Sequence, residues 1–165
     1  MMETRDLSHV EKADTTAGPR YAIYWTPPPD GPLEVLAAAL FQDDAGTLAH
    51  AIGVAPETLR AVTATPAVYG LHATLKAPFR LSTGTATAEL HAGVEAFARH
   101  RAPVTIPEPE LAEFGPYLVL RPSRPAPEVD ALAGDLVRAI DALRAPTGAD
   151  ELARRRASGL TDRQE

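Results

Sequence analysis

The sequence predicts an α+β fold in which helices pack on one side of a largely antiparallel sheet. Segments with the alternation of β-strands and segments with helical spacing of apolar residues follow one another along the chain. No strand is followed by a Gly-rich phosphate loop of the kind found in parallel, doubly wound folds. Apolar residues make up 45% of the 165 residues, which is enough for a globular domain with a core.

The first half of the chain predicts two strands separated by two helices. The first strand alternates aromatic and β-branched residues with smaller ones and ends at a run of prolines. The first helix follows Asp30, a capping residue, and carries an apolar stripe. The second helix follows a loop of moderate length that contains His50, and the second strand is stopped by Pro78. These elements cover residues 20–26 (strand), 32–41 (helix, with Leu33, Leu36, Ala37 and Leu40 inward), 56–64 (helix) and 71–76 (strand).

The second half predicts three helices, a short strand and a hairpin. Thr85 or Thr87 caps the first of these helices, whose inner stripe is Leu90, Val94 and Phe97. The hairpin turns at the dipeptide 115–116, and a long helix with regular apolar spacing follows it. A capping box at residues 147–150 begins the last helix, which Gly159 closes. These elements cover residues 85–101 (helix), 103–107 (strand), 111–121 (hairpin), 127–143 (helix) and 150–157 (helix).

Composition excludes several classes of function. The chain has no cysteine, so it has no disulfide, zinc-thiolate site or cysteine nucleophile. Its net charge of −6 lacks the positive field that non-specific nucleic-acid binding needs. No apolar run approaches the ~20 residues that span a bilayer, and the start of the chain does not resemble a secretory signal. We therefore expect a cytoplasmic protein, with a disordered or atypical leader at residues 1–19 and one domain over residues 20–165.

The strongest candidate for chemistry is the strand that contains His72, Thr74 and Lys76 at every second position. Alternation on a strand would place these three side chains on one face, with Leu71, Ala73 and Leu75 on the core face. An imidazole can move a proton near neutral pH, a hydroxyl can donate a hydrogen bond, and an ammonium can neutralise negative charge. The three together suit a phosphate. The plainer alternative is an ordinary strand, with His72 merely hydrogen-bonded and Lys76 solvated.

Three segments in order carry a resemblance to a known family: RYAIYW at 20–25, YGLHATLKAPFRL at 69–81, and RAPTGADELARRRASGLTDRQE at 144–165. Together they resemble the two-histidine phosphoesterase superfamily. More narrowly, they resemble bacterial members associated with phosphonate metabolism, a family labelled as a domain of unknown function. The similarity covers nearly all of residues 20–165.

The resemblance implies a two-lobed, pseudo-symmetric α+β fold in which each lobe supplies one His-x-Thr or His-x-Ser strand to a shared groove. The two histidines act as general acid and general base on a phosphodiester, typically a cyclic nucleotide or cyclic ribose phosphate, without a metal or other cofactor. His72 and Thr74 match the first of these motifs as catalytic residues. Lys76 and Arg80 correspond to phosphate-facing neighbours. Apart from the resemblance, the position of Tyr69 at the entry to the motif strand predicts that it binds the substrate.

The chain departs from that pattern in its histidines. It has five, and none besides His72 is followed two positions later by Thr or Ser. The residues Thr161 to Gln164 form a helix-start signature with no apolar stretch behind it. Both observations favour a shortened chain that holds one lobe and part of the second. A polar tail with a chance match is the alternative.

Three functions follow as hypotheses. The first is a cyclic-phosphodiesterase-type domain, inactive or impaired with one motif, whose substrate is a small phosphodiester or, among nucleic acids, an RNA end. The second is a non-catalytic module that binds a phosphorylated metabolite through Thr74 and Lys76. The third is self-association through the face meant for the missing lobe.

Overall fold

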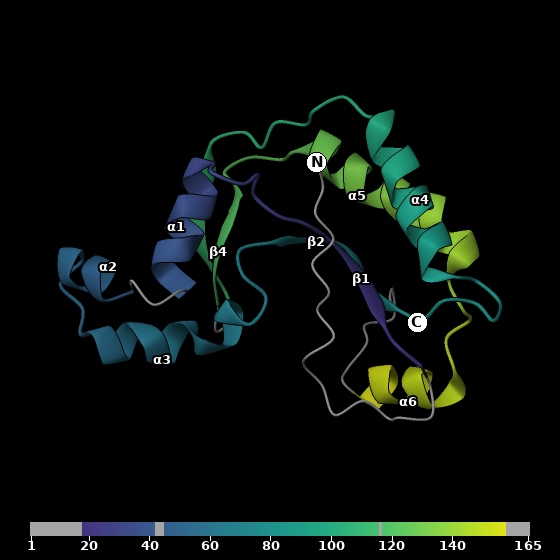
Figure 1. Cartoon of the computed structure of the whole chain (residues 1–165), viewed down its shortest axis with the longest axis horizontal. Helices are drawn as coiled ribbons and strands as arrows, with labels where there is room; N and C mark the ends of the chain where they lie inside the picture. The colour runs from purple at the N-terminus through teal and green to yellow at the C-terminus, as the bar shows by residue number, and fades with distance from the viewer. Residues whose placement is uncertain (1–17, 42–44, 116, 158–165) are drawn as a thin grey trace. The chain divides into compact units, whose positions relative to one another are not determined.

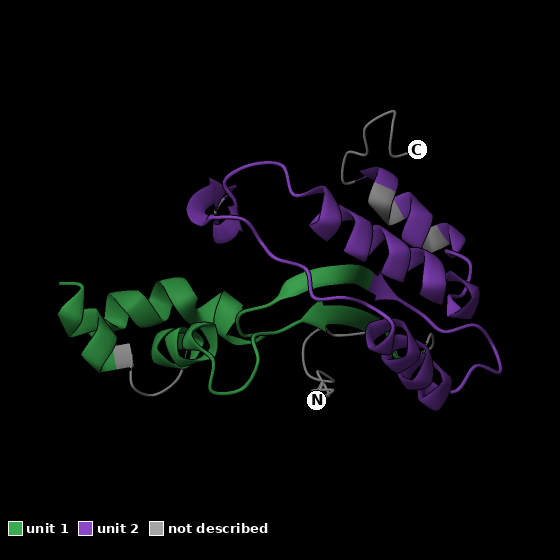
Figure 2. Cartoon of the chain, turned by 90° about the horizontal axis from the view of Figure 1, so that it is seen from above, with its two compact units in different colours: residues 1–77 green, residues 78–165 purple. Residues whose placement is uncertain are grey.

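The computed structural model describes residues 18–41, 45–115 and 117–157, and the chain forms two compact units, residues 1–77 and 78–165 (Figure 2). The α+β class is confirmed. The strands form two separate two-stranded sheets, β1–β2 and β3–β4, instead of the single sheet that we expected. In chain order the elements are β1 (Tyr21–Trp25), α1 (Pro32–Phe41), α2 (Ala45–Ala51), α3 (Pro56–Ala67), β2 (Ala73–Phe79), α4 (Thr87–Arg99), β3 (Pro109–Phe114), β4 (Tyr117–Pro122), α5 (Pro127–Ile140), the 3-10 helix η1 (Asp141–Leu143) and α6 (Ala149–Ala157) (Figure 1).

Helices α1, α2 and α3 of the first unit pack on one another and enclose a small apolar core. Ala49 and Leu59 are its buried centre, and the half-buried Leu40, Leu48 and Val54 pack around them. Helix α3 begins at a proline, which suits the first helical position because no intrahelical partner exists there for its missing N–H. The three helices therefore stabilise one another through a shared apolar contact.

The sequence prediction missed helix α2. Its seven residues were expected to be a loop, so His50 lies in the last turn of a helix instead. Two turns are too short to show a 3.6-residue period, and packing on α3 stabilises the helix instead. The N–H of Val54 donates to the carbonyl of Ala49 (2.9 Å) and closes the end of α2.

Two further differences concern α1 and α3. Asp30 has a left-handed backbone (φ 61°) and precedes Gly31, whose carbonyl accepts the N–H of Val35 at 3.0 Å. The helix thus starts after Gly31, and Asp30 is not the capping residue that we predicted. In α1 the buried position is Ala37, whereas Leu36 is exposed. Helix α3 continues past residue 64 and has Pro66 inside its last turn.

In the second unit, α4 lies beside α5 (Figure 1). Leu90 of α4 and Leu136 and Ile140 of α5 are buried, as the apolar stripes predicted. A Cβ at Gly93 would lie 3.1 Å from Ile140 Cδ1, so the lack of a side chain there permits the close approach of the helices. The first helical bonds of α4 follow Ala86, whose N–H donates to the Glu89 carboxylate (2.8 Å). Ala86 is therefore the N-cap, and neither predicted threonine is.

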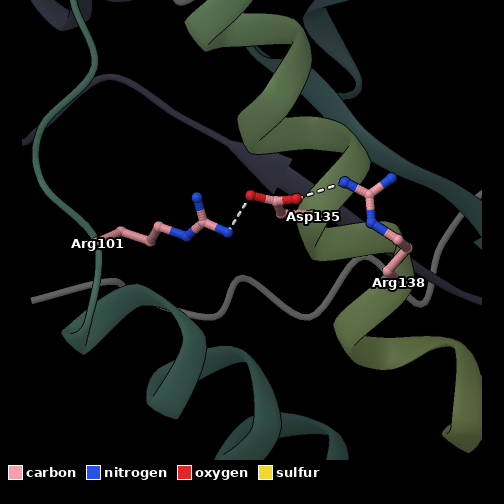
Figure 3. A network of polar contacts seen from close by, with 3 residues as sticks. All are labelled: Arg101, Asp135 and Arg138. Carbon is pink, nitrogen blue, oxygen red and sulfur yellow. Dashed lines mark hydrogen bonds and ion pairs between the residues drawn. The ribbon is translucent and has the colours of Figure 1, made fainter.

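An ion-pair network links the segment after α4 to α5. The Asp135 carboxylate lies between two guanidinium groups, those of Arg101 and Arg138, and accepts a hydrogen bond from each (Figure 3). The Arg101 guanidinium also stacks on the Phe97 ring, 4.7 Å from its centroid. These hydrogen bonds, first that from Arg101, hold the pKa of Asp135 below its usual range. The Arg101–Asp135 ion pair therefore ties the segment after α4 to α5.

Strands β3 and β4 form the predicted antiparallel hairpin, with Phe114 opposite Tyr117 beside the turn and Pro109 opposite Pro122 at the far end. An ion pair crosses the hairpin between Arg121 and Glu110. The predicted strand over residues 103–107 is wrong, because that segment has irregular backbone. Prolines at 103 and 107 remove two of the N–H groups that a strand there would need.

The remaining elements agree with the sequence to within a few residues. The predicted helix 127–143 is α5 followed by η1, a tighter last turn. The chain after η1 pairs with residues that follow β2, since Ser82 N–H donates to the Leu143 carbonyl (2.9 Å). Helix α6 begins one residue before its expected start. The predicted closing residue Gly159, the helix-start signature at 161–164 and all but the end of the predicted leader lie outside the described residues.

Within the described part of the chain, no helix combines the length and the apolar character that crossing a membrane requires.

Candidate functional site

The candidate site is built around His72, in the first unit, one residue before β2. The strand begins two residues later than predicted and continues through Pro78 to Phe79. A proline fits here because a strand of a two-stranded sheet has an edge where no N–H is needed. His72 therefore lies at the start of the strand, where its ring is half-buried.

Gly70 fixes the orientation of the His72 ring. The ring nitrogen Nδ1 lies 2.9 Å from the Gly70 carbonyl oxygen, which can only accept a hydrogen bond. Nδ1 must then carry the proton in the neutral ring, and Nε2 is left as the basic nitrogen. Gly70 has a left-handed backbone (φ 69°), a conformation that costs other residues free energy. This hydrogen bond thus determines both the ring position and the tautomer.

Two tyrosines flank the imidazole. The Tyr24 ring, from β1, lies 4.4 Å from the His72 ring between centroids, and the Tyr69 ring lies at 5.9 Å, both tilted. Burial, and then the neighbouring Tyr69, raise the pKa of the Tyr24 hydroxyl above its ordinary value. At neutral pH this hydroxyl is therefore protonated and can donate a hydrogen bond.

The expected division of the motif strand into a polar face and a core face is wrong. Thr74 is exposed, as predicted, but Ala73 is exposed as well, although we expected it in the core. Lys76 is buried, with 5% of its surface exposed, and it is not without a partner. A buried ammonium must be paired, so tertiary packing and not alternation decides where this cation lies. Thr74 is thus the accessible polar side chain beside His72.

Arg80 lies just after β2 and belongs to the second unit. It is half-buried, and its carbonyl accepts the N–H of Ala145 at 2.8 Å. Of the predicted substrate-binding residues, Tyr69 thus lies beside His72 in the first unit, whereas Arg80 belongs to the second unit. Among the described residues, no group of three or more His, Asp or Glu side chains is arranged to hold a metal ion.

The cluster Tyr24–His72–Tyr69 can move a proton and donate hydrogen bonds. The basic Nε2 can accept a proton from a nucleophile or, once protonated, deliver it to a leaving oxygen. The Thr74 hydroxyl can donate to a phosphoryl oxygen. The sequence analysis did not identify Tyr24 as a site residue. The pattern of a strand does not show which other strand it pairs with, so the contact of Tyr24 with His72 could not be predicted. The only signal was that the first segment of the family resemblance contains it.

Comparison with known proteins gives a family and two relatives. A family model described as "Protein of unknown function (DUF1045)" matches residues 74–165. A protein of Janthinobacterium sp. (strain Marseille) named ribose 1,5-bisphosphate phosphokinase PhnN is 33% identical over 150 residues, which are 88% of this chain and 33% of that relative. A protein of the same name from Laribacter hongkongensis (strain HLHK9) is 36% identical over 132 residues, 77% of this chain and 31% of the relative.

The chain thus spans about one third of the length of these curated relatives. No solved structure matches it.

Proposed function

The chain belongs to the family described as protein of unknown function (DUF1045), and from that premise we propose that it is a phosphoesterase-like domain for a cyclic ribose or nucleotide phosphodiester. The observation that carries the proposal is the His72 ring, whose Nδ1 is held by the Gly70 carbonyl so that Nε2 is the basic nitrogen. The relation to two-histidine phosphoesterases and a place in phosphonate metabolism are parts of this proposal.

In the proposed reaction, water attacks the phosphorus of a cyclic phosphodiester and one ester P–O bond breaks. One group removes the proton of the attacking water, and another returns a proton to the leaving ribose oxygen. His72 Nε2 performs one of these transfers, and the exposed Thr74 hydroxyl donates a hydrogen bond to a phosphoryl oxygen. Tyr24, protonated at neutral pH, is placed against the ring as a further donor. Lys76 is a weaker candidate than Thr74 for contact with the phosphate, because its side chain is buried.

His72 supplies only one of the two proton transfers. General acid and general base groups each contribute about 10²–10⁴-fold to a rate. We therefore expect slow turnover from this chain by itself.

The names of the relatives point to a second candidate, transfer of a phosphoryl group to a ribose phosphate. These names describe proteins about three times as long as this chain. The chain has no G-x-x-x-x-G-K-[ST] loop, the usual cradle for nucleotide phosphates. We therefore propose that what this chain shares with them is the class of ligand, a phosphorylated ribose. A module that binds such a ligand without hydrolysing it remains the alternative.

The test is hydrolysis of 2′,3′-cyclic AMP, followed by phosphorus NMR, by the wild type and two histidine variants. We expect slow hydrolysis that His72→Ala abolishes and that His91→Ala, a matched change of an exposed histidine on α4, leaves intact. Nitrogen NMR of the His72 ring during addition of the cyclic nucleotide is the second measurement. Hydrolysis unaffected by His72→Ala, or a His72 signal that the nucleotide does not move, would contradict the proposal.

A further inference from the structure

The β3–β4 hairpin has an uncovered apolar face. The register places Leu111 opposite Leu120 and Glu113 opposite Leu118, so these four side chains share one face. The three leucines are 73% (Leu111), 41% (Leu120) and 74% (Leu118) exposed. A two-stranded hairpin is at best marginally stable in water, and it needs more strands or a covered apolar face. The hairpin therefore needs additional strands to be stable.

The free edge of β4 has hydrogen-bonding groups available to such a partner. Only two residues separate Phe114 from Tyr117, and the residues that close a two-residue turn exchange hydrogen bonds. Paired residues then alternate, so Leu118 and Leu120 direct their backbone N–H and C=O groups away from β3. Among the described residues, the sheet has no strand beyond β4. Within the described ranges, the outer edge of β4 is thus an open β-sheet edge.

Proteins usually protect such an edge with a charge, a proline or a bulge. The open positions Leu118 and Leu120 carry no charge, and the one-to-one register leaves no bulge. The one proline of β4 is its last residue, Pro122. We propose that β4 pairs in antiparallel fashion with β4 of a second copy of this chain, giving a four-stranded sheet across a two-fold axis.

One register satisfies both the hydrogen bonds and the side chains. A two-fold axis at Val119 places Leu118 of one copy opposite Leu120 of the other, and these are the residues whose backbone groups point outward. The two hairpins then form one four-stranded sheet, and each β4 covers the open edge of the other. On the opposite face, Arg121 comes beside Tyr117 of the second copy, where a cation can pack on an aromatic ring.

The other edge of the hairpin is less suited to self-pairing. The outward positions of β3 are Pro109, Leu111 and Glu113. Pro109 lacks an N–H, and pairing two copies about a two-fold axis would bring two Glu113 carboxylates to the same edge. The composition of the two strands therefore favours β4.

A single cysteine tests the register directly, because the chain has none of its own. At the axis, the two copies of residue 119 would form a non-hydrogen-bonded pair with Cα atoms about 4.5 Å apart, within the range of a disulfide. Val119→Cys should therefore give a disulfide-linked dimer on mild oxidation. Ala112→Cys is the matched control, because Ala112 lies opposite Val119 on β3. In the proposed sheet the two copies of residue 112 are separated by both β4 strands, so this variant should stay largely uncrosslinked.

Sedimentation of the unmodified chain across a range of concentrations gives the second measurement. We expect a monomer–dimer equilibrium, weakened about tenfold or more by Leu118→Lys, which puts a charge at the proposed contact. Leu118 is exposed, so circular dichroism should show an unchanged fold. A monomer at all concentrations, or equal crosslinking of both cysteine variants, would overturn the proposal.

Discussion

At the scale of single residues, the glycine before the motif strand determines how the candidate catalytic ring is held. Gly70 has φ 69°, and a Cβ there would meet no atom within 4 Å. A larger residue would therefore be strained by its backbone and not by a clash. We expect Gly70→Ala to lower the free energy of unfolding by about 1 kcal/mol, since a left-handed backbone costs roughly that for a residue with a Cβ. Urea unfolding measures this.

The same substitution should also loosen the bond between the Gly70 carbonyl and His72 Nδ1. Nitrogen NMR of the His72 ring should then show a mixture of the two neutral tautomers in place of one. Gly134→Ala is the matched control, because Gly134 is in the middle of α5 and its new Cβ would make only ordinary contact with Arg138. It should stabilise the protein by up to about 1 kcal/mol. Equal effects of the two variants would contradict the argument.

At the scale of elements, the ion-pair network that links the segment after α4 to α5 predicts a pH dependence of stability. The hydrogen bonds from Arg101 and Arg138 lower the pKa of Asp135 in the folded state. A carboxyl group with a lowered folded pKa contributes stability above its unfolded pKa, about 3.9, and loses it as the pH falls through the folded value. We expect the stability difference between wild type and Asp135→Asn to be present at pH 7 and to vanish in acid.

Urea unfolding of both proteins at several pH values between 7 and 2 measures this difference. The variants Arg101→Ala and Arg138→Ala measure separately how much each cation contributes to this stability difference. The first should reduce the difference more, because the hydrogen bond from Arg101 is the largest cause of the shift and Arg101 also stacks on Phe97. A stability difference that is independent of pH would show that the ion pair does not contribute to the stability of the folded state.

The elements that could be predicted from the sequence are those with enough residues to show a period. Helix α5 has 14 residues and a regular apolar stripe, and the hairpin has two strands around a glycine turn. Helix α2 has seven residues and is stabilised by packing, so its sequence alone gave no signal. The prediction of a strand over residues 103–107 was wrong because a local pattern was present without a strand. The apolar residues between the prolines have the composition of a strand, but the prolines lack N–H groups that a sheet needs.

The site followed the same rule. His72, Thr74 and Tyr69 could be proposed together because they are close in sequence, and the structure places the Tyr69 ring 5.9 Å from the His72 ring. Tyr24 could not, because its contact joins two residues that are 48 positions apart in sequence. The burial of Lys76 was also beyond the sequence, because packing around a strand, and not its alternation, determines which polar side chain is covered.

At the scale of the whole molecule, the net charge of −6 means that an anion can be bound only where a few donors or cations are placed together. A general affinity for anions is not expected of a protein with this charge, so stabilisation by a phosphorylated ribose would have to come from a few placed donors. A ligand that binds only the folded state at 100 times its Kd adds about 2.7 kcal/mol of stability. For a chain of this length that is a rise in melting temperature of roughly 5–10 °C.

We therefore expect 2′,3′-cyclic AMP and ribose 5-phosphate to raise the melting temperature, and sulfate at equal ionic strength to have little effect. Thr74→Ala should remove most of the rise, because it deletes the exposed hydroxyl beside His72. His72→Ala separates the two functions: in an enzyme it stops turnover yet leaves part of the stabilisation, since Thr74 still donates to the phosphate. Stabilisation by sulfate as strong as by the ribose phosphates, or unchanged by Thr74→Ala, would place the anion elsewhere on the chain.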